Sequence, residues 1–183
     1  LAPQANESIV DLCAAPGGKT LQLCASGAEV VALDRSDTRL KRLRANLERT
    51  GLEAEIVVTP AEDWEDDRSF DALLLDAPCT ATGTFRRNPE VLRATKPADV
   101  AKLADVQHRL LDAAAERVKP GGRLVYCVCS MEREEGETRP EQRRRIPRTR
   151  SSSALSTANP SRGTASTTTC FTSASCSRVS MPR

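Results

Sequence analysis

The chain has 183 residues, of which 39% are hydrophobic and 28% are charged, and this is enough to build one globular domain with its own core. No segment approaches the roughly 20 apolar residues of a membrane span, and the first residues, LAPQANES, lack the basic and apolar regions of a secretory signal. The sequence therefore predicts neither a membrane protein nor a secreted one, and a cytoplasmic protein is expected. The net charge of +2 is unevenly distributed, because residues 138–183 contain nine Arg and one acidic residue.

Short apolar segments recur through residues 7–137 and predict five β-strands. Each segment is followed by small, polar or helix-forming residues, as in chains that alternate strands and helices. The predicted strands are Ser8–Leu12, Glu29–Asp34, Ala54–Val58, Phe70–Asp76 and Gly122–Val128.

Two of the segments between these strands have apolar residues at helical spacing. Asp37–Thr50 has three leucines on one face and is followed by Gly51, a typical helix stop. Pro97–Val118 has a longer apolar stripe and is followed by a Lys-Pro-Gly-Gly turn. Repeated strand–helix units predict an α/β, Rossmann-like fold with a mostly parallel, doubly wound sheet. Such sheets bind ligands beyond the carboxyl ends of their strands.

Residues 138–183 differ from the preceding domain in composition. Ser, Thr and Arg dominate, Pro is scattered, and no apolar period of 2 or 3.6 is sustained. We expect residues 1–137 to form the domain and residues 138–183 to be a low-complexity tail that is disordered or non-native, for example through a shifted reading frame that removes the last strands of the sheet. A natural basic tail that binds RNA phosphates is the alternative.

A turn rich in small residues follows the first predicted strand and opens a helix. Its sequence, CAAPGGK, lets the backbone approach a ligand closely, and the helix that follows presents free N–H groups. It matches neither the GxGxxG nor the GxxxxGK[ST] pattern, so it does not predict a triphosphate site. Asp34 ends the next strand, where a carboxylate can accept hydrogen bonds from both hydroxyls of a ribose. The alternative is an ordinary strand-to-helix turn with Asp34 as a helix cap.

The seven cysteines are odd in number and lack a secretory context, so reduced thiols are expected. Cys129 lies at the end of the last predicted strand, where Ser130 and a following helix N-terminus are expected to lower its pKa. Cys79 follows the fourth strand, so the two thiols are predicted to share one substrate. Cys24 and Cys127 are interpreted as buried core residues. With no CxxC pair and one histidine, His108, no metal site is expected.

Four segments together resemble a known family. The segments DLCAAPGGKT, LDAPCTATG, RRNPEV and KPGGRLVYCVCS, within residues 8–137, are similar to the bacterial Sun/Fmu-type ribosomal RNA cytosine-C5 methyltransferases of the wider Nol1/Nop2/Sun group. This resemblance implies a class I methyltransferase fold, S-adenosyl-L-methionine as the cofactor, and a cytosine in ribosomal RNA as the substrate. It also implies that the chain is truncated at both ends. A monomer that binds neither a membrane nor a metal is expected.

The resemblance assigns roles to particular residues. Cys129 matches the nucleophile of the family and Cys79 the second cysteine, which assists product release. Asp34 matches the residue that holds the ribose hydroxyls, and Asp76 lies near the amino group of the cofactor and the target base. The methionine and ribose parts of the cofactor are contacted by the turn, whose residues are Cys13, Ala14, Ala15, Pro16, Gly17, Gly18 and Lys19.

The sequence departs from the family pattern at one cofactor position, because Pro60 stands where relatives have an acidic residue near the adenine. Two readings other than methylation of ribosomal RNA stay open. One is a non-catalytic remnant that binds RNA or the cofactor. The other is a methyltransferase that acts on transfer RNA or protein.

Overall fold

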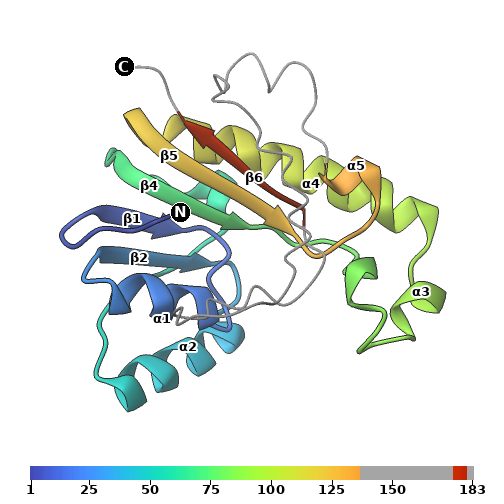
Figure 1. The fold of residues 1–183 in the computed structure, drawn as a ribbon, viewed down its shortest axis with the longest axis horizontal. Coiled ribbons are helices and arrows are strands. Elements are labelled where there is room, and N and C mark those ends of the chain that lie inside the picture. Colours follow the sequence, from blue (N-terminus) through green and yellow to red (C-terminus); the bar gives the residue numbers. More distant parts are fainter. Residues whose placement is uncertain (137–174, 181–183) are drawn as a thin grey trace, which may run out of the picture.

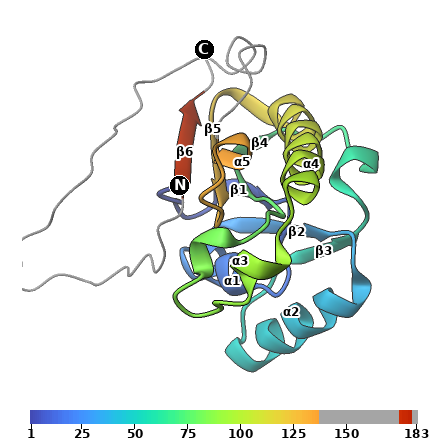
Figure 2. The same cartoon turned by 90° about the vertical axis from the view of Figure 1, so that its right-hand side faces the viewer.

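The computed structural model describes residues 1–136 and the backbone of residues 175–180 (Figure 1). A single sheet forms the centre, with α4 (Pro97–Glu116) on one face and α1 (Gly18–Ala25) and α2 (Asp37–Thr50) on the other (Figure 2). None of the helices in the described residues is long and apolar enough to cross a membrane.

The sheet has the order β3-β2-β1-β4-β5-β6. Neighbouring strands among the first five are parallel, and β6 pairs antiparallel with β5. The predicted, mostly parallel α/β sheet is therefore confirmed. The strand bounds are Ser8–Asp11 for β1, Glu29–Asp34 for β2, Glu55–Val58 for β3, Phe70–Asp76 for β4, Val118–Val128 for β5 and Ser175–Ser180 for β6.

Side chains that alternate along the strands build two separate cores. Leu33, Leu73 and Leu124 face α4 and pack with Leu110 and Leu111. Their sequence neighbours on the strands face the opposite way and pack against the buried leucines of α1 and α2. This alternation follows from the two-residue period of a strand. It also explains why the central strands have apolar residues at almost every position.

The ends of α2 agree with the sequence signals. The hydroxyl oxygen of Ser36 caps its first turn by accepting a hydrogen bond from the Arg39 backbone N–H, at 3.3 Å. Gly51 ends it with φ 64°, a left-handed conformation that is rarely adopted by residues with a side chain. The cap is thus Ser36 and not Asp34, the residue considered for this role in the alternative reading of the sequence.

The boundary between α4 and β5 differs from the prediction. The apolar stripe extended the helix to Val118, but α4 ends at Glu116, and Val118 pairs with Phe70 of β4 as the first residue of β5. The pairing shifts register between Phe70 and Ala72, so the Lys-Pro-Gly-Gly turn bulges out of the ladder. Val118 is buried in both descriptions, which is why periodicity assigned it to the wrong element.

The tail, predicted to be disordered or non-native over residues 138–183, lies largely outside the described residues. Within it the structure describes only Ser175–Ser180, the backbone of β6 along the edge of β5. Four short helical elements remain in the described residues: the 3₁₀ turns η1 (Ala61–Asp63) and η2 (Thr82–Thr84), and the helices α3 (Val91–Ala94) and α5 (Arg133–Gly136).

Candidate active site at the carboxyl edge of the sheet

The candidate site lies where the chain order of the sheet reverses. From β1 the chain moves outward through β2 to β3, and it then returns to the other side of β1 as β4. Doubly wound sheets bind ligands at such a reversal, beyond the carboxyl ends of the two central strands. Here those ends carry the small-residue turn after Asp11 and the segment after Asp76.

Two adjacent glycines of the turn have different functions. Gly17 has φ 105°, and a Cβ atom at this position would collide with Cδ1 of Leu43 in α2. Gly17 is therefore required for the turn to pack against α2. Gly18 begins α1, and a Cβ atom there would have nothing within 4 Å. The space above Gly18 is open, as a turn that receives a ligand requires.

Asp34 holds the turn in place from the end of β2. Its carboxyl group is 2% exposed and accepts hydrogen bonds from the backbone N–H of Ala15, at 3.2 Å, and of Ser36, at 2.9 Å. Arg39 lies 3.4 Å from the same carboxyl group and donates to the carbonyl oxygen of Ala15, at 2.5 Å. Each carboxylate oxygen can accept more than one hydrogen bond, so Asp34 retains acceptor capacity for a ligand.

Asp11, which the sequence did not single out, lies buried beneath the turn. It is 1% exposed, and its Oδ2 accepts a hydrogen bond from the Thr20 hydroxyl at 2.8 Å. Its Oδ1 has no hydrogen-bond partner among the described residues. Burial raises the pKa of Asp11 to about 6, because desolvation outweighs the hydrogen bond from Thr20.

Lys19 and Asp76 form an ion pair between the turn and the end of β4, with Nζ 2.5 Å from Oδ2. Desolvation opposes the charge of Lys19, but the hydrogen bond and the negative charge of Asp76 outweigh it and raise the pKa of Lys19. The Cys127 thiol donates to the other oxygen of Asp76 at 3.4 Å. Asp76 thus joins the small-residue turn to the strand that leads to the candidate nucleophile.

The predicted juxtaposition of the two thiols is present. Sγ of Cys79 and Sγ of Cys129 are 3.3 Å apart, and both residues are half-buried. The hydrogen bond from Cys79 lowers the pKa of Cys129 to about 7, in spite of desolvation and the charge of Asp76. The same contact raises the pKa of Cys79 above its usual range. The structure thus corrects the sequence prediction, because the main cause is Cys79 and not a following helix.

The other described cysteines are less suited to act as nucleophiles. Cys13 lies in the turn, and burial together with nearby carboxyl groups raises its pKa to about 12. Cys24 and Cys127 are buried in the core on the side of α1 and α2, as the sequence predicted. The pKa of Cys129 is lowered toward neutrality, whereas those of Cys13, Cys24 and Cys79 are raised.

Sequence reasoning missed a buried polar network behind the two thiols. Glu135 and Gln107 are each 1% exposed and hydrogen-bonded to each other, although Gln107 lies on the apolar face of α4. A glutamine on the buried face of an amphipathic helix is the one signal that pointed to such a network. Nothing in the spacing identified Glu135, which stands among other acidic residues such as the exposed Glu134.

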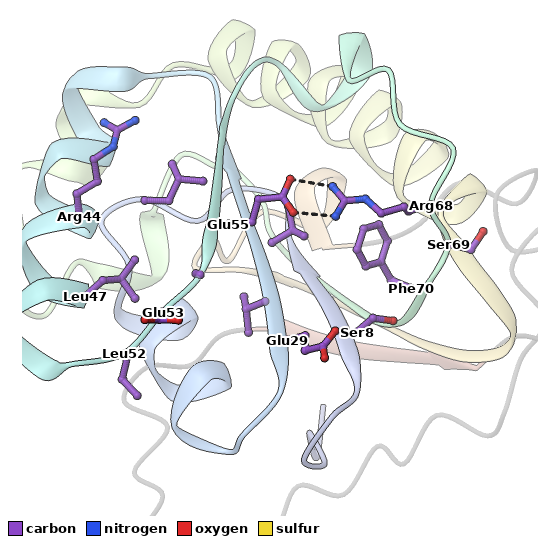
Figure 3. A pocket seen from close by; sticks show the side chains of 14 residues that line it. Ser8, Glu29, Arg44, Leu47, Leu52, Glu53, Glu55, Arg68, Ser69 and Phe70 are labelled. Carbon is purple, nitrogen blue, oxygen red and sulfur yellow. Dashed lines mark hydrogen bonds and ion pairs between the residues drawn. The ribbon is translucent and has the colours of Figure 1, made fainter.

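One cavity in the described part of the chain is remote from the thiols. It measures about 910 Å³ and is lined by residues at the amino ends of β1 to β4. Arg68 pairs with Glu55 in this lining (Figure 3). Because parallel strands bring all the chemistry above to their carboxyl ends, this cavity belongs to the opposite edge of the sheet. A cavity of about 300 Å³, lined in part by Thr82, Lys96 and Glu132, adjoins the thiol segments instead.

The chain is similar in sequence and fold to several known proteins. A family model described as 16S rRNA methyltransferase RsmB/F matches residues 1–171. Ribosomal RNA small subunit methyltransferase B of Vibrio cholerae is 48% identical over 136 residues, which are 72% of this chain and 31% of that protein. A structure of NSun6 from Pyrococcus horikoshii with SFG is 32% identical with a TM-score of 0.67, covering 73% of this chain and 35% of the other.

A methyltransferase homolog from Pyrococcus horikoshii is also similar, with 36% identity and a TM-score of 0.65 over 74% of this chain and 44% of the other. These similarities confirm the predicted class I methyltransferase fold. The chain spans about a third of the length of the curated relative from Vibrio.

Proposed function

The chain belongs to the 16S rRNA methyltransferase RsmB/F family, and we propose that it transfers a methyl group from S-adenosyl-L-methionine to C5 of a cytosine in ribosomal RNA. The observation that carries this proposal is the contact between Cys79 and Cys129 beside the small-residue turn. Cytosine C5 is a poor nucleophile, and a thiol that adds to C6 overcomes this difficulty.

The residues of the turn suit S-adenosyl-L-methionine. The open space above Gly18, the unpartnered Oδ1 of Asp11 and the acceptor capacity of Asp34 lie together at the reversal of the sheet. The SFG in the NSun6 structure is an analogue of this cofactor, which supports the same assignment. Asp34 would hold the ribose, and the turn would surround the methionine part. The bound cofactor supplies the methyl group as an electrophilic sulfonium.

Cys129 is the proposed nucleophile. Its lowered pKa makes a substantial thiolate fraction available at neutral pH. The thiolate adds to C6 of the cytosine while N3 gains a proton, so the electron pair of the C5–C6 double bond becomes available at C5 for methylation. Asp76 contacts both Lys19 of the turn and Cys127. The cofactor and the base would therefore meet beside this ion pair, where proximity supplies much of the rate enhancement.

Cys79 is proposed to act in release. After methylation the C5 proton must leave, its bonding electrons must restore the C5–C6 double bond, and the bond from Cys129 to C6 must break. Cys79 lies 3.3 Å from the Cys129 sulfur, so it is within reach of the same atoms. Beside the Cys129 thiolate Cys79 is held as a protonated thiol, because this contact raises its pKa. Addition of Cys129 to C6 removes that thiolate, so Cys79 can then lose its own proton to solvent and, as a thiolate, accept the C5 proton.

RNA would approach from the side of η2 and α3. Arg86, Arg87, Arg93 and Lys96 are exposed on this segment, directly after the loop that carries Cys79. Because residues 1–136 are acidic overall, a local group of cations of this kind is what phosphate contact requires.

Transfer of label from methyl-labelled S-adenosyl-L-methionine to 16S ribosomal RNA, with mapping of the modified base, tests the proposal. We expect label in 5-methylcytosine, and no label with the Cys129→Ala variant. Label in transfer RNA or in protein would show that this molecule, and not ribosomal RNA, is the substrate. Binding of RNA and cofactor without methyl transfer would support the non-catalytic reading. This reading is kept because the match covers 31% of the relative from Vibrio cholerae.

A further inference from the structure

Glu135 is a buried acidic side chain that none of the steps above uses. It lies on α5, six residues after Cys129, and is 1% exposed, whereas its neighbour Glu134 is exposed. Burying a carboxyl group is unfavourable unless its oxygens receive hydrogen bonds. The contacts of Glu135 therefore indicate what its burial achieves.

Three uncharged donors reach the carboxyl group of Glu135. Oε1 accepts from the Thr80 backbone N–H at 2.9 Å and from Nε2 of Gln107 at 3.1 Å, and Oε2 accepts from the Thr80 hydroxyl at 2.5 Å. The other hydrogen bond of Gln107 Nε2 goes to the carbonyl oxygen of Pro78, at 2.9 Å. Glu135 and Gln107 thus hold the residues on both sides of Cys79.

The same network continues to the residue after Cys129. The hydroxyl oxygens of Thr80 and Ser130 are 3.1 Å apart. Because Thr80 gives its single hydroxyl proton to Glu135, Ser130 must be the donor to Thr80. The hydroxyl of Thr82 is then free to donate to Ser130, at 3.1 Å. Glu135 is the final acceptor and sets the direction of this whole chain of hydroxyl groups.

The network therefore joins the residue that follows one thiol to the residue that follows the other. Thr80 and Ser130 are 50 residues apart in the sequence, and the Cys79–Cys129 contact spans the same separation. Each thiol segment leaves the end of its strand as a loop. The ladder from β4 to β5 ends at the pair Asp76–Cys127. Beyond it the loops are joined by the Cys129 N–H, which donates to Sγ of Cys79 at 3.3 Å, and by the Gly83 N–H, which donates to the Cys129 carbonyl oxygen at 3.0 Å. The network of Glu135 adds a tie between side chains to these contacts.

We propose that Glu135 is a positioning residue that, through Thr80 and Ser130, holds the Cys79 thiol against Cys129 so that Cys79 can donate a hydrogen bond to the Cys129 thiolate. This inference deepens the proposed function and rests on it for its catalytic meaning. The physical consequence, a more acidic Cys129 thiol, depends only on the hydrogen-bonded pair and can be measured without RNA or cofactor.

The test follows alkylation of Cys129 by iodoacetamide against pH in the full chain, with the modified peptide quantified by mass spectrometry. In the chain without substitutions we expect the alkylation rate of Cys129 to reach half its maximum near pH 7. This pH is the midpoint. Glu135→Ala should move the midpoint toward the ordinary cysteine value of about 8.5, so that alkylation at pH 7 slows roughly tenfold. The matched control is Glu134→Ala, on the same short helix, which should leave the midpoint unchanged.

A double-mutant cycle separates positioning from a general loss of structure. Cys79→Ala alone should shift the midpoint as Glu135→Ala does, and the double variant should show no further shift, because both changes remove the same hydrogen bond. Equal midpoints for Glu135→Ala and the unmodified chain would overturn the proposal, as would additive shifts in the double variant.

A second variant keeps the test decisive if Glu135→Ala does not fold. Thr80→Val removes the hydroxyl that links Glu135 to Ser130 and leaves the backbone N–H contact intact. It should produce the same shift, and an unchanged midpoint would overturn the proposal. Alkylation needs neither RNA nor S-adenosyl-L-methionine. A chain that does not transfer methyl groups can therefore still show the shifted midpoint, and an active enzyme can still show no shift, so the two proposals fail separately.

Discussion

The sulfur atoms of Cys79 and Cys129 lie 3.3 Å apart, on the loops that follow the neighbouring parallel strands β4 and β5. A thiol pair at this distance shares a proton, so one member becomes more acidic and the other less so. The asymmetry favours the thiolate at Cys129. One contact therefore provides a nucleophile for addition to the base and a second thiol for the later proton removal.

Replacing the nucleophile should abolish methyl transfer and leave cofactor binding intact. Cys129→Ala removes the atom that adds to C6, whereas the cofactor turn lies at the end of β1 and does not include Cys129. Transfer of label to RNA should fall to background, while the dissociation constant for S-adenosyl-L-methionine, measured by calorimetry, should stay within about twofold. Full activity in this variant would mean that Cys79 or Cys127, and not Cys129, is the nucleophile.

Replacing Cys79 should instead trap the covalent intermediate. If Cys79 acts in release, Cys79→Ala can still add Cys129 to the base and methylate it, but the adduct breaks down slowly. A protein–RNA band should then appear on a denaturing gel, and the additional change Cys129→Ala should remove it. If no adduct accumulates during turnover, the two thiols do not divide the reaction in this way.

The adjacent glycines of the turn provide a matched pair of variants. Gly17→Ala must adopt φ 105° and place a Cβ atom against Leu43. Strain of this kind costs about 1–3 kcal/mol, which corresponds to a fall in Tm of roughly 2–12 °C for a chain of this size. Gly18→Ala meets nothing within 4 Å, so its Tm should change little. Gly18→Ala should weaken cofactor binding instead, because its methyl group enters the open space. Similar Tm values for the two variants would contradict this division.

Asp34 should contribute to cofactor affinity. A hydrogen bond to a charged group is worth about 1.5–3 kcal/mol, so Asp34→Ala should weaken S-adenosyl-L-methionine binding roughly tenfold or more. Part of this loss would come through the turn, because Asp34 also accepts from the Ala15 N–H. Asp37→Ala, an exposed acidic residue three positions later that pairs with Arg44, is the control and should leave the affinity unchanged. Calorimetry that shows equal affinity for both variants would limit Asp34 to holding the turn.

The fold could be predicted from sequence because its signals are local. β2, β4 and α2 have the predicted bounds, since an apolar run or a leucine spacing ends there at a polar residue or at Gly51. The topology then follows from the handedness of parallel strand–helix units. The predicted end of α4 was wrong because Val118 fits both a helical and a strand pattern.

The candidate site could be predicted only in part. Motif resemblance located Cys79 and Cys129, and strand order brought them together. The acceptor of the hydroxyl chain, Glu135, could not be found, because its partners Thr80 and Gln107 are 55 and 28 residues away and no spacing connects them. Such contacts depend on how loops pack and not on the period of any one element.

The pH dependence of methyl transfer should report the acidity of Cys129. The thiolate is the reactive form, and the pKa of Cys129 is lowered to about 7, so the single-turnover rate should rise with pH through 7 and level off above it. Between pH 6 and pH 8 the thiolate fraction grows from about one tenth to about nine tenths, roughly a tenfold rise.

Asp11, whose pKa is raised to about 6, becomes neutral at lower pH. It lies under the cofactor turn, so its protonation should appear in cofactor affinity, and saturating S-adenosyl-L-methionine should separate the two effects. A rate that is flat from pH 6 to pH 8 at saturating cofactor would show that formation of the Cys129 thiolate does not limit the reaction.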